Sequence, residues 1–392
     1  MPDELIVRIA ARGDGVTESG RHAPFAAPGD MLAEDGAVTP GPHHQTPPCR
    51  HFPRCGGCQL QHLDDASYAQ FITDRITHAL AQQGLETDIR APHLSPPRTR
   101  RRASLQAERR GKEVVLGFSE AGSNALIDIR QCEILLPELF ALLAPLRKLL
   151  AGLIAPRRRA GVALTMADQG VDVTLSGIDA DGLTAAETLG RFAQAQQLAR
   201  LSIDDGYGAQ VRWEPQPATV TLGGVAVPLP VDAFLQATVD GEAALVAAVG
   251  EASVGAPTIA DLFAGLGTFA LSLPGKLYAA EASRDAALAL KTTGRVLVDH
   301  RDLYRRPLTA AECSRFGAVV LDPPRAGAEM QAQELARSTA PVIAYVSCNP
   351  NSFARDARII AEGGYHLDWI QPVGQFRWST HVELAARFSR QG

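Results

Sequence analysis

The stretch PTIADLFAGLGTF (residues 257–269) joins a largely apolar run to a turn that contains two glycines. The run has the pattern of a strand in a parallel sheet, and Gly265 and Gly267 follow it directly. Glycines at a strand-to-helix turn let a ligand approach the backbone at the carboxyl end of the strand. The spacing is not G-x-G-x-x-G, and the lysine of a phosphate-binding P-loop is missing. The stretch therefore predicts an α/β domain with a cofactor site.

Apolar strands and helical segments also alternate along the rest of the C-terminal part of the chain. Four further strands are expected in KLYAAEA, GRVLVDH, FGAVVLDPP and APVIAYVSC. Helical segments separate them, such as AEMQAQELARST and SRDAALALKTT, which has Ser283 as its expected N-cap. Strands this apolar, separated by helices, indicate a parallel sheet covered on both faces. We expect a Rossmann-like α/β domain at residues 231–392.

Acidic residues at the tips of the neighbouring strands indicate the kind of cofactor. Glu281 ends the second strand, where a carboxylate accepts hydrogen bonds from both hydroxyls of a ribose. Asp302 follows the third strand and is placed to meet an adenine edge or its neighbourhood. Because the pattern lacks the groups that bind a pyrophosphate, it favours S-adenosylmethionine over NAD.

Two polar motifs follow the fourth and fifth strands, at the same edge of the sheet as the glycine turn. LDPPRAG (321–327) contains Asp322, and YVSCNPNSFARD (345–356) contains Cys348. Cysteines are more often buried and structural, but the polar neighbours of Cys348 favour a nucleophile at the lip of the cofactor crevice. The segment STHVELAARF then supplies Glu383 beside the expected last strand.

A thiolate, a carboxylate and a methyl sulfonium together fit methylation of carbon 5 of a uracil. That carbon is too weak a nucleophile to take a methyl group unaided, whereas addition of Cys348 to carbon 6 turns the ring into a reactive enolate. A base must afterwards remove the carbon-5 proton, which is the role expected of Glu383. Asp322 is placed to bond the N–H of the ring and so to orient the base.

The motifs DLFAGLGTF, LDPPRAG, YVSCNPNSFARD and HVE, in this order, closely resemble those of the RNA uracil-5-methyltransferases. The resemblance runs from about residue 49 to the C-terminus, and it implies a class I S-adenosylmethionine-dependent methyltransferase domain. It implies that Cys348 is the covalent nucleophile and Glu383 the catalytic base. Phe234 matches an aromatic residue expected to stack on a flipped-out base.

The motifs and the resemblance together define a pocket. Its expected cofactor contacts are Gln236, Phe263, Gly265, Gly267, Thr268, Glu281, Asp302 and Asp322. Its expected substrate contacts are Phe234, Gln236, Asp322 and Arg325. Thr268 and Ser352 stand where the family commonly has asparagine and threonine, and both keep a hydrogen-bonding side chain.

Three of the six cysteines lie in CRHFPRCGGCQLQHL (49–63), as Cys49, Cys55 and Cys58. A fourth thiol is available at Cys132, and four thiolates suit either a 4Fe–4S cluster or a zinc ion. One branch of the family that the chain resembles carries a 4Fe–4S cluster on the same C-x5-C-G-G-C-x-x-Q loop. The resemblance therefore implies a cluster that shapes the loop for RNA contact, and it leaves Cys313 as a structural residue.

The N-terminal part is expected to be rich in strands. Residues 1–46 look like a reduced TRAM or OB-like segment that is too short for a closed barrel. Residues 47–230 are expected to form a small β-rich, RNA-binding central domain that carries the iron–sulfur loop, with hairpins over 98–130. Helical patterns cover 65–85 and 135–155.

Composition limits the classes of partner. The net charge is −5, 46% of the residues are hydrophobic, and 21% are charged, as is ordinary for a soluble globular protein. The most apolar window carries charges and leucines at helical spacing, so a packed helix is expected and not a membrane span. Two arginine-rich runs, at 96–112 and 157–159, favour phosphate contact, although a solvated hairpin face explains them equally well. We expect a cytoplasmic monomer that acts on RNA, without a membrane or DNA partner.

The expected function is methylation of carbon 5 of a specific uridine in RNA, by an enzyme of the EC 2.1.1 class. The 23S ribosomal RNA is the expected target because cluster-bearing bacterial relatives act mostly on it. The alternatives are a methyltransferase for uridine 54 of transfer RNA, an RNA cytosine-5-methyltransferase, and an inactive iron–sulfur RNA-binding protein. The intact Cys348, Glu383 and glycine turn argue against an inactive protein.

Overall fold

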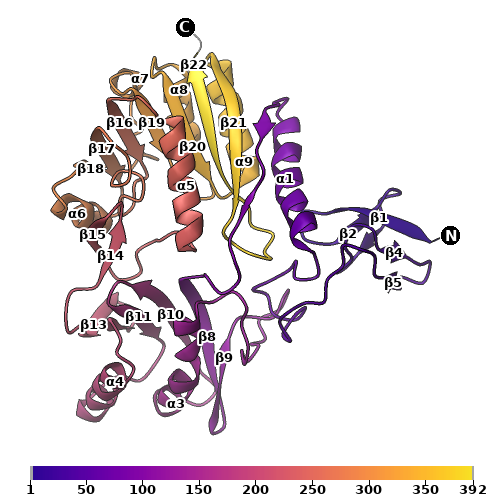
Figure 1. The fold of residues 1–392 in the computed structure, drawn as a ribbon. Helices are drawn as coiled ribbons and strands as arrows, with labels where there is room; N and C mark the ends of the chain where they lie inside the picture. Colours follow the sequence, from indigo (N-terminus) through magenta and orange to yellow (C-terminus); the bar gives the residue numbers. More distant parts are fainter. Residues whose placement is uncertain (1–2, 391–392) are drawn as a thin grey trace. The chain divides into compact units, whose positions relative to one another are not determined.

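The computed structural model describes residues 3–390, and the chain divides into two compact units (Figure 1). Unit 1 comprises Met1–Tyr68, Pro96–Thr219 and Arg377–Thr380. Unit 2 comprises Ala69–Ser95, Val220–Phe376 and His381–Gly392. The chain thus contributes several separate segments to each unit, and the three domain ranges expected from the sequence stay a prediction.

Unit 1 begins with a small sheet in which all strands pair antiparallel, in the order β3-β2-β1-β4-β5. The strands are β1 (Glu4–Ile9), β2 (Gly15–Thr17), β3 (His22–Ala23), β4 (Met31–Leu32) and β5 (Val38–Thr39). Ile6 and Leu32 belong to its small apolar core. The buried carboxylate of Asp30 accepts hydrogen bonds from the backbone N–H groups of Ala27 and Gly41, both at 2.7 Å. The result is an antiparallel half-barrel.

A larger sheet of unit 1 has the order β13-β12-β11-β10-β8-β9. Its strands are β8 (Arg102–Arg110), β9 (Glu113–Gly117), β10 (Arg159–Ala167), β11 (Gly170–Ser176), β12 (Arg200–Asp204) and β13 (Ala209–Trp213). Of the hairpins expected over 98–130, one is formed by β8 and β9. Residues 160–230 lie in the part expected to be β-rich, and they also contain helix α4 (Leu183–Ala195), which buries Leu189 and Ala193.

The helix expected over 135–155 is divided into α2 (Pro137–Ala141) and α3 (Leu143–Leu153). Pro145 explains the division, because it has no N–H to donate to the carbonyl of Ala141 and its ring would clash there in a continuous helix. In the first turn of α3 the same proline is tolerated. The apolar face of α3 packs into the core that lies against the larger sheet.

Unit 2 is built on a sheet with the order β18-β17-β16-β19-β20-β22-β21-β6, and β7 also pairs with β21. The strands are β6 (Asp88–Ile89), β7 (His93–Leu94), β16 (Thr258–Leu262), β17 (Lys276–Glu281), β18 (Leu297–His300), β19 (Ala318–Leu321), β20 (Val342–Ser347), β21 (Tyr365–Gly374) and β22 (Glu383–Arg390). The five strands expected from the sequence are parallel. The sheet as a whole is mixed, since β22 runs antiparallel to both of its neighbours.

Helices cover both faces of this sheet, with α5 on one face and α8 and α9 on the other (Figure 1). They are α5 (Val239–Ala252), α6 (Arg284–Thr292), α7 (Ala310–Cys313), α8 (Glu329–Ala336) and α9 (Pro350–Glu362). Ser283 caps α6 as expected, accepting from the N–H of Ala286. Strands β14 (Thr219–Leu222) and β15 (Val225–Pro228) form a separate pair. The helix expected over 65–85 is present as α1 (Asp65–Ala81).

From β16 the sheet extends to one side through β17 and β18, whereas the next strand in the chain, β19, lies on the other side of β16. The strand order therefore reverses at β16. Ligands of open α/β sheets bind in the crevice at such a switch point, beyond the carboxyl ends of the strands. Within residues 3–390, every helix is too short or too polar to cross a membrane.

Candidate active site and cysteine cluster

The glycine turn after β16 is held by the carboxylate at the tip of β17. Glu281 accepts hydrogen bonds from the N–H of Gly265 (2.8 Å) and the N–H of Ser283 (2.6 Å). Gly267 has a φ of +93°, and a Cβ on it would lie 2.5 Å from Cδ1 of Leu290. Each carboxylate oxygen retains further acceptor capacity, so Glu281 can brace the turn and still receive ribose hydroxyls.

Two aromatic rings lie at this turn. Phe263 has a left-handed backbone, with a φ of +63°, and its ring centroid is 5.5 Å from that of Tyr304. Asp302 accepts a hydrogen bond from the N–H of Tyr304 at 3.0 Å, which fixes the loop after β18. A non-glycine residue in the left-handed region is uncommon and is found often at functional sites. Phe263, Asp302 and Glu281 thus lie where an adenosyl group is expected.

Asp261, near the end of β16, is a fully buried acid. Its carboxylate accepts from the N–H of Ala270 at 2.9 Å, while Oδ1 has no hydrogen-bond partner among the described residues. Burial raises the pKa of Asp261 to about 8, and the charges of Asp322 and Glu281 act in the same direction. An acid in this state holds a proton near neutral pH, so Asp261 joins the turn as a neutral, bonded group.

A chain of hydrogen bonds joins the two acids predicted for the chemistry. Nε2 of Gln236 donates to Oδ2 of Asp322 at 3.1 Å. Nε2 of Gln375 donates both to Oε1 of Gln236 (2.7 Å) and to Oε2 of Glu383 (3.0 Å). Burial raises the pKa of both acids; for Glu383 the charge of Asp322 adds to this, while the amide of Gln375 lowers it.

Cys348 lies directly after β20 and is half-buried, so it is neither walled off nor fully solvated. Burial raises the pKa of its thiol to about 11, and the charges of Glu383 and Asp322 raise it further, while Arg325 lowers it. These influences require that Cys348, Glu383, Asp322 and Arg325 lie close enough to interact. Residues from three separate segments of unit 2, after β19, after β20 and at the start of β22, therefore meet at one edge of its sheet.

The loops that carry Asp322 and Cys348 are bonded to each other. The carbonyl of Arg325 accepts from Nδ2 of Asn349 and from the hydroxyl of Ser352, both at 3.0 Å. This explains the polar residues of the S-C-N-P-N-S motif, which cap α9 and hold the neighbouring loop. Ser352 supplies a hydroxyl here as a threonine would.

Sequence reasoning missed two residues of this region, Gln375 and Asp356. Asp356 is buried, and its Oδ2 accepts from the N–H of Ala328 and the hydroxyl of Tyr345, both at 2.6 Å. It thereby anchors the end of the LDPPRAG loop. An aspartate in the middle of an otherwise ordinary helical segment gave no signal, and neither did a glutamine before the last strand.

The other predicted contacts are placed less tightly. Phe234 is 62% exposed, and its ring is thus accessible to a ligand. Thr268 lies between Gly267 and Phe269 in the turn and is half-buried, with its carbonyl bonded to the hydroxyl of Ser272. Their roles as base and cofactor contacts stay predictions.

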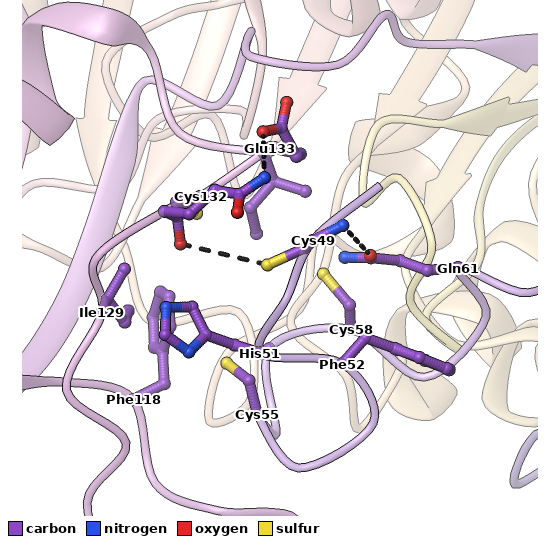
Figure 2. Close-up of a pocket in the computed structure, with 13 residues that line it drawn as sticks. Cys49, His51, Phe52, Cys55, Cys58, Gln61, Phe118, Ile129, Cys132 and Glu133 are labelled. Atoms are coloured by element: carbon purple, nitrogen blue, oxygen red, sulfur yellow. Dashed lines mark hydrogen bonds between the residues drawn. The ribbon is translucent and has the colours of Figure 1, made fainter. Parts of the chain in front are cut away.

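All four predicted cluster cysteines line one cavity of unit 1 (Figure 2). Figure 2 shows Cys49, Cys55 and Cys58 coming from one loop, with the segment of Cys132 on the opposite side. The carboxamide oxygen of Gln61 accepts from the N–H of Cys49 at 3.2 Å. Among residues 3–390, no group of three or more His, Cys, Asp or Glu side chains is arranged to hold a single metal ion.

Burial makes three of these thiols poor acids. It raises the pKa of Cys58 to about 12, and it raises those of Cys55 and Cys132 as well. Thiolates in this cavity therefore require a compensating positive charge. Cys313 is separate, as expected: it is fully buried, and its sulfur accepts from Nε2 of Gln331 at 3.5 Å.

Comparison with known proteins agrees with this geometry. Residues 292–391 match the family model "tRNA (Uracil-5-)-methyltransferase". An uncharacterised RNA methyltransferase of Zymomonas mobilis is 49% identical over 98% of this chain and 99% of its own length. The 23S rRNA (uracil(1939)-C(5))-methyltransferase RlmD of Alteromonas naphthalenivorans is 32% identical over 90% of this chain and 78% of its own length.

Among solved structures, the fold is similar to that of the Pyrococcus abyssi tRNA (uracil-54, C5)-methyltransferase in complex with S-adenosyl-L-homocysteine. The TM-score is 0.75, with 21% identity over 98% of this chain and 99% of that one. The chain belongs to the RNA uracil-5-methyltransferase family. It is accordingly an S-adenosylmethionine-dependent enzyme that methylates carbon 5 of uracil in RNA.

Proposed function

We propose that this enzyme methylates a uridine of ribosomal RNA through a covalent bond between Cys348 and carbon 6 of a flipped-out base. The observation that carries the mechanism is the meeting of Cys348, Asp322 and Glu383 at the edge of the sheet beside the glycine turn. Extrusion of the base is required because carbons 5 and 6 are shielded within a stack.

The steps follow from the chemistry of the residues. The half-buried thiol of Cys348 releases its proton to solvent, and the resulting thiolate bonds to carbon 6 while the electron pair of the C5–C6 double bond moves into the ring as an enolate. S-adenosylmethionine supplies an electrophilic methyl group. Carbon 5 takes this group, and the electron pair of the broken carbon–sulfur bond stays with the departing thioether.

Glu383 completes the reaction as the base. Its carboxylate accepts the proton of carbon 5, and the electrons of that bond restore the C5–C6 double bond. The bond from carbon 6 to Cys348 then breaks, and its electron pair returns to the sulfur. Asp322 bonds the N–H of the ring and Phe234 stacks on the base in this proposal, while Gln236 holds Asp322.

Ribosomal RNA is proposed as the target because the relative named as a 23S rRNA enzyme aligns with 90% of this chain at 32% identity. The likeness to the tRNA enzyme supports the fold alone, at 21% identity. Transfer RNA remains the second candidate because the matching family model bears that description.

We also propose that Cys49, Cys55, Cys58 and Cys132 hold a 4Fe–4S cluster. His51 and Glu133 also line the cavity, but the four thiols alone complete a ligand set that suits iron–sulfur or zinc. The choice of the cluster over zinc rests on the C-x5-C-G-G-C-x-x-Q spacing of the loop, which resembles that of cluster-bearing relatives. The cluster would supply a rigid link between the cysteine loop and the segment of Cys132.

Incubation with S-adenosylmethionine and 5-fluorouridine-substituted 23S rRNA tests the mechanism and the target. Fluorine at carbon 5 blocks the last proton removal, so a covalent protein–RNA adduct should accumulate. Transfer RNA with the same substitution serves as the competing substrate. No adduct with the wild type, or an undiminished adduct with Cys348→Ala, contradicts the mechanism, and an adduct with transfer RNA alone contradicts the target.

Anaerobic purification tests the cluster. A brown protein with iron and acid-labile sulfide is expected, and each Cys→Ser substitution in the set should reduce both. A colourless protein that carries zinc contradicts the proposal.

A further inference from the structure

Gln375 is a buried amide that spans the space between the two parts of the proposed site. Its Nε2 donates to Oε1 of Gln236 (2.7 Å) and to Oε2 of Glu383 (3.0 Å), and its Oε1 accepts from the N–H of Ala237 (2.8 Å). Only 1% of the residue is exposed. The orientation of the amide is chemically determined, because a flipped amide would place Nε2 against an N–H and oxygen against a carboxylate.

The surrounding backbone is shaped to hold this side chain. A Cβ on Gly241, in the first turn of α5, would lie 2.6 Å from Cβ of Gln375. On the other side, Val373 at the end of β21 pairs with Glu383 at the start of β22. Gln375 therefore stands within two residues of the pair that fixes the backbone of Glu383, and its reach to the carboxylate is short.

We propose that Gln375 is a positioning residue that orients the carboxylate of Glu383 for removal of the carbon-5 proton and links it through Gln236 to Asp322. The proposal rests on the covalent mechanism above. Because Nε2 holds one carboxylate oxygen, rotation of the group is restricted and a proton can be taken in a fixed direction. The same amide nitrogen also donates to Oε1 of Gln236, but Asp322 keeps its own bond from Nε2 of Gln236, so the loss of Gln375 acts chiefly on the base.

The protonation of Glu383 gives the proposal a readout that packing alone would not provide. The titratable groups that face Glu383 are Asp322 and Cys348, and the positive charge of Arg325 acts on Cys348. His381 precedes Glu383 by two residues, and its ring centroid lies 5.7 Å from that of Phe376. The N–H of Gln375 lowers the pKa of Glu383 against burial and the charge of Asp322. Its loss leaves Glu383 protonated up to a higher pH, where it cannot act as a base.

Two variants test the proposal, with a control in strand β21, which directly precedes Gln375. Gln375→Met removes the amide, and Gln375→Glu keeps the shape but replaces the N–H donor by oxygen. Gln371→Met is the matched control, because its Nε2 bonds the carbonyls of Ala91 and Pro372 and not an acid. Formation of the 5-fluorouridine adduct and turnover of unsubstituted 23S rRNA are measured for each protein from about pH 6 to pH 9.

Both Gln375 variants should form the 5-fluorouridine adduct within about twofold of the wild-type rate, because that adduct does not need the final base. Their turnover of unsubstituted RNA should fall by about tenfold or more, within the range of general-base effects. For Gln375→Met the acidic limb of the pH profile should move to higher pH. The control should match the wild type in both assays.

Wild-type turnover and an unchanged pH profile in both variants overturn the inference, and so does an equal loss of adduct formation and turnover. If Gln375→Met does not fold, the isosteric Gln375→Glu decides by the same comparison. A wild-type protein that forms no adduct at all contradicts the proposed mechanism instead, so the two failures are distinguishable.

Discussion

At the scale of single residues, the site consists of groups that burial keeps out of their charged forms. The pKa values of Cys348, Asp322 and Glu383 are all raised by burial. The charges of the two carboxylates also raise the pKa of the thiol. Arg325 is the positive charge that opposes this at Cys348. A nucleophile in such surroundings needs that charge, or the protonation of a neighbouring acid, before it can attack.

Replacing Arg325 with glutamine should therefore slow formation of the 5-fluorouridine adduct. If the pKa of the thiol rises by one unit, the fraction of thiolate falls by about tenfold at a pH below that pKa, and the rate of adduct formation falls with it. Raising the pH should recover part of the rate. Rates of adduct formation measured against pH check this. Arg337→Gln is a suitable control, since that arginine pairs with Glu334 on the surface. Equal rates for the Arg325 variant and the wild type at every pH would show that the charge is not needed.

Glu383→Gln should separate the two halves of the reaction. The amide keeps the size of the side chain but cannot accept the carbon-5 proton, so methyl transfer proceeds and release does not. A covalent adduct with unsubstituted uridine RNA is expected, with turnover reduced by about 10²- to 10⁴-fold. Gel electrophoresis under denaturing conditions detects the adduct, and free turnover without it would assign the base to another group.

Asp261 predicts how stability depends on pH. Its folded-state pKa of about 8 lies above the ordinary aspartate value of 3.8, so between these two values the folded protein holds a proton that the unfolded chain has lost. The stabilising contribution is complete below the lower value and is lost as the pH rises through the higher one. In urea unfolding at about pH 5 and pH 8, Asp261→Asn should lose less stability with rising pH than the wild type. Identical losses in the two proteins would contradict the shift.

The residues that sequence reasoning located share one property: they follow apolar strands or glycine turns that reveal their place in the fold. Glu281, Asp322 and Cys348 each stand at or just after a strand end. Gln375 also directly follows a strand, β21, but its role depends on a contact with Gln236, 139 positions earlier, which the local sequence does not reveal. Asp356 was missed for the same reason, since its partners lie in a loop and a strand that only tertiary packing brings to it.

At the scale of elements, the five parallel strands were predictable because burial on both faces makes them continuously apolar. The antiparallel insertion of β22 was not, because that strand is also mostly buried on both faces and has the same pattern. Helix α5 was missed since its sequence, VDGEAALVAAVGEA, is apolar on most sides and lacks a clear helical period. Its start is marked by the N–H of Gly241, which donates a hydrogen bond to the hydroxyl oxygen of Thr238.

The glycine turn after β16 allows a matched pair of substitutions. Gly267→Ala places a methyl group 2.5 Å from buried Leu290 and forces a φ of +93° on alanine, whereas Gly265→Ala at a φ of +56° meets open space. The left-handed backbone alone costs about 1–2 kcal/mol, and crowding of the core adds about 1–3 kcal/mol for Gly267→Ala. Urea unfolding and S-adenosylmethionine binding by calorimetry measure both effects. Equal losses of stability in the two variants would contradict the crowding at Gly267.

At the scale of the whole molecule, the basic runs of unit 1 prove to be partly neutralised within the protein. Arg98 pairs with Glu133, and both Arg110 and Arg159 pair with Glu108. Arg101 is buried. The arginine-rich sequence 98–112 is therefore a poor measure of the charge presented to RNA, which explains why composition alone left its role open.

Three exposed basic residues near one end of the larger sheet of unit 1 are better candidates for phosphate contact. Lys112 lies in the turn between β8 and β9, and Arg157 and Arg158 lie directly before β10, whose Arg159 is in register with Glu108 of β8. The pairing of β8 with β10 brings the turn and the segment before β10 to the same end of the sheet. A cluster of positive charge at one end of a sheet can contact phosphates even though the net charge is −5.

Replacing Lys112, Arg157 and Arg158 together with glutamine should weaken RNA binding and reduce its dependence on salt. Each lost phosphate contact removes about 0.7–0.9 from the slope of log K against log salt, so the slope should fall by about two for three contacts. Filter binding of 23S rRNA fragments over a range of salt concentrations measures this. The same change of charge at Arg284, Lys291 and Arg295, which are exposed in and after α6, is the control. If the two triple variants lose affinity and salt dependence equally, RNA is attracted by the charge of the protein in general and not by this end of unit 1.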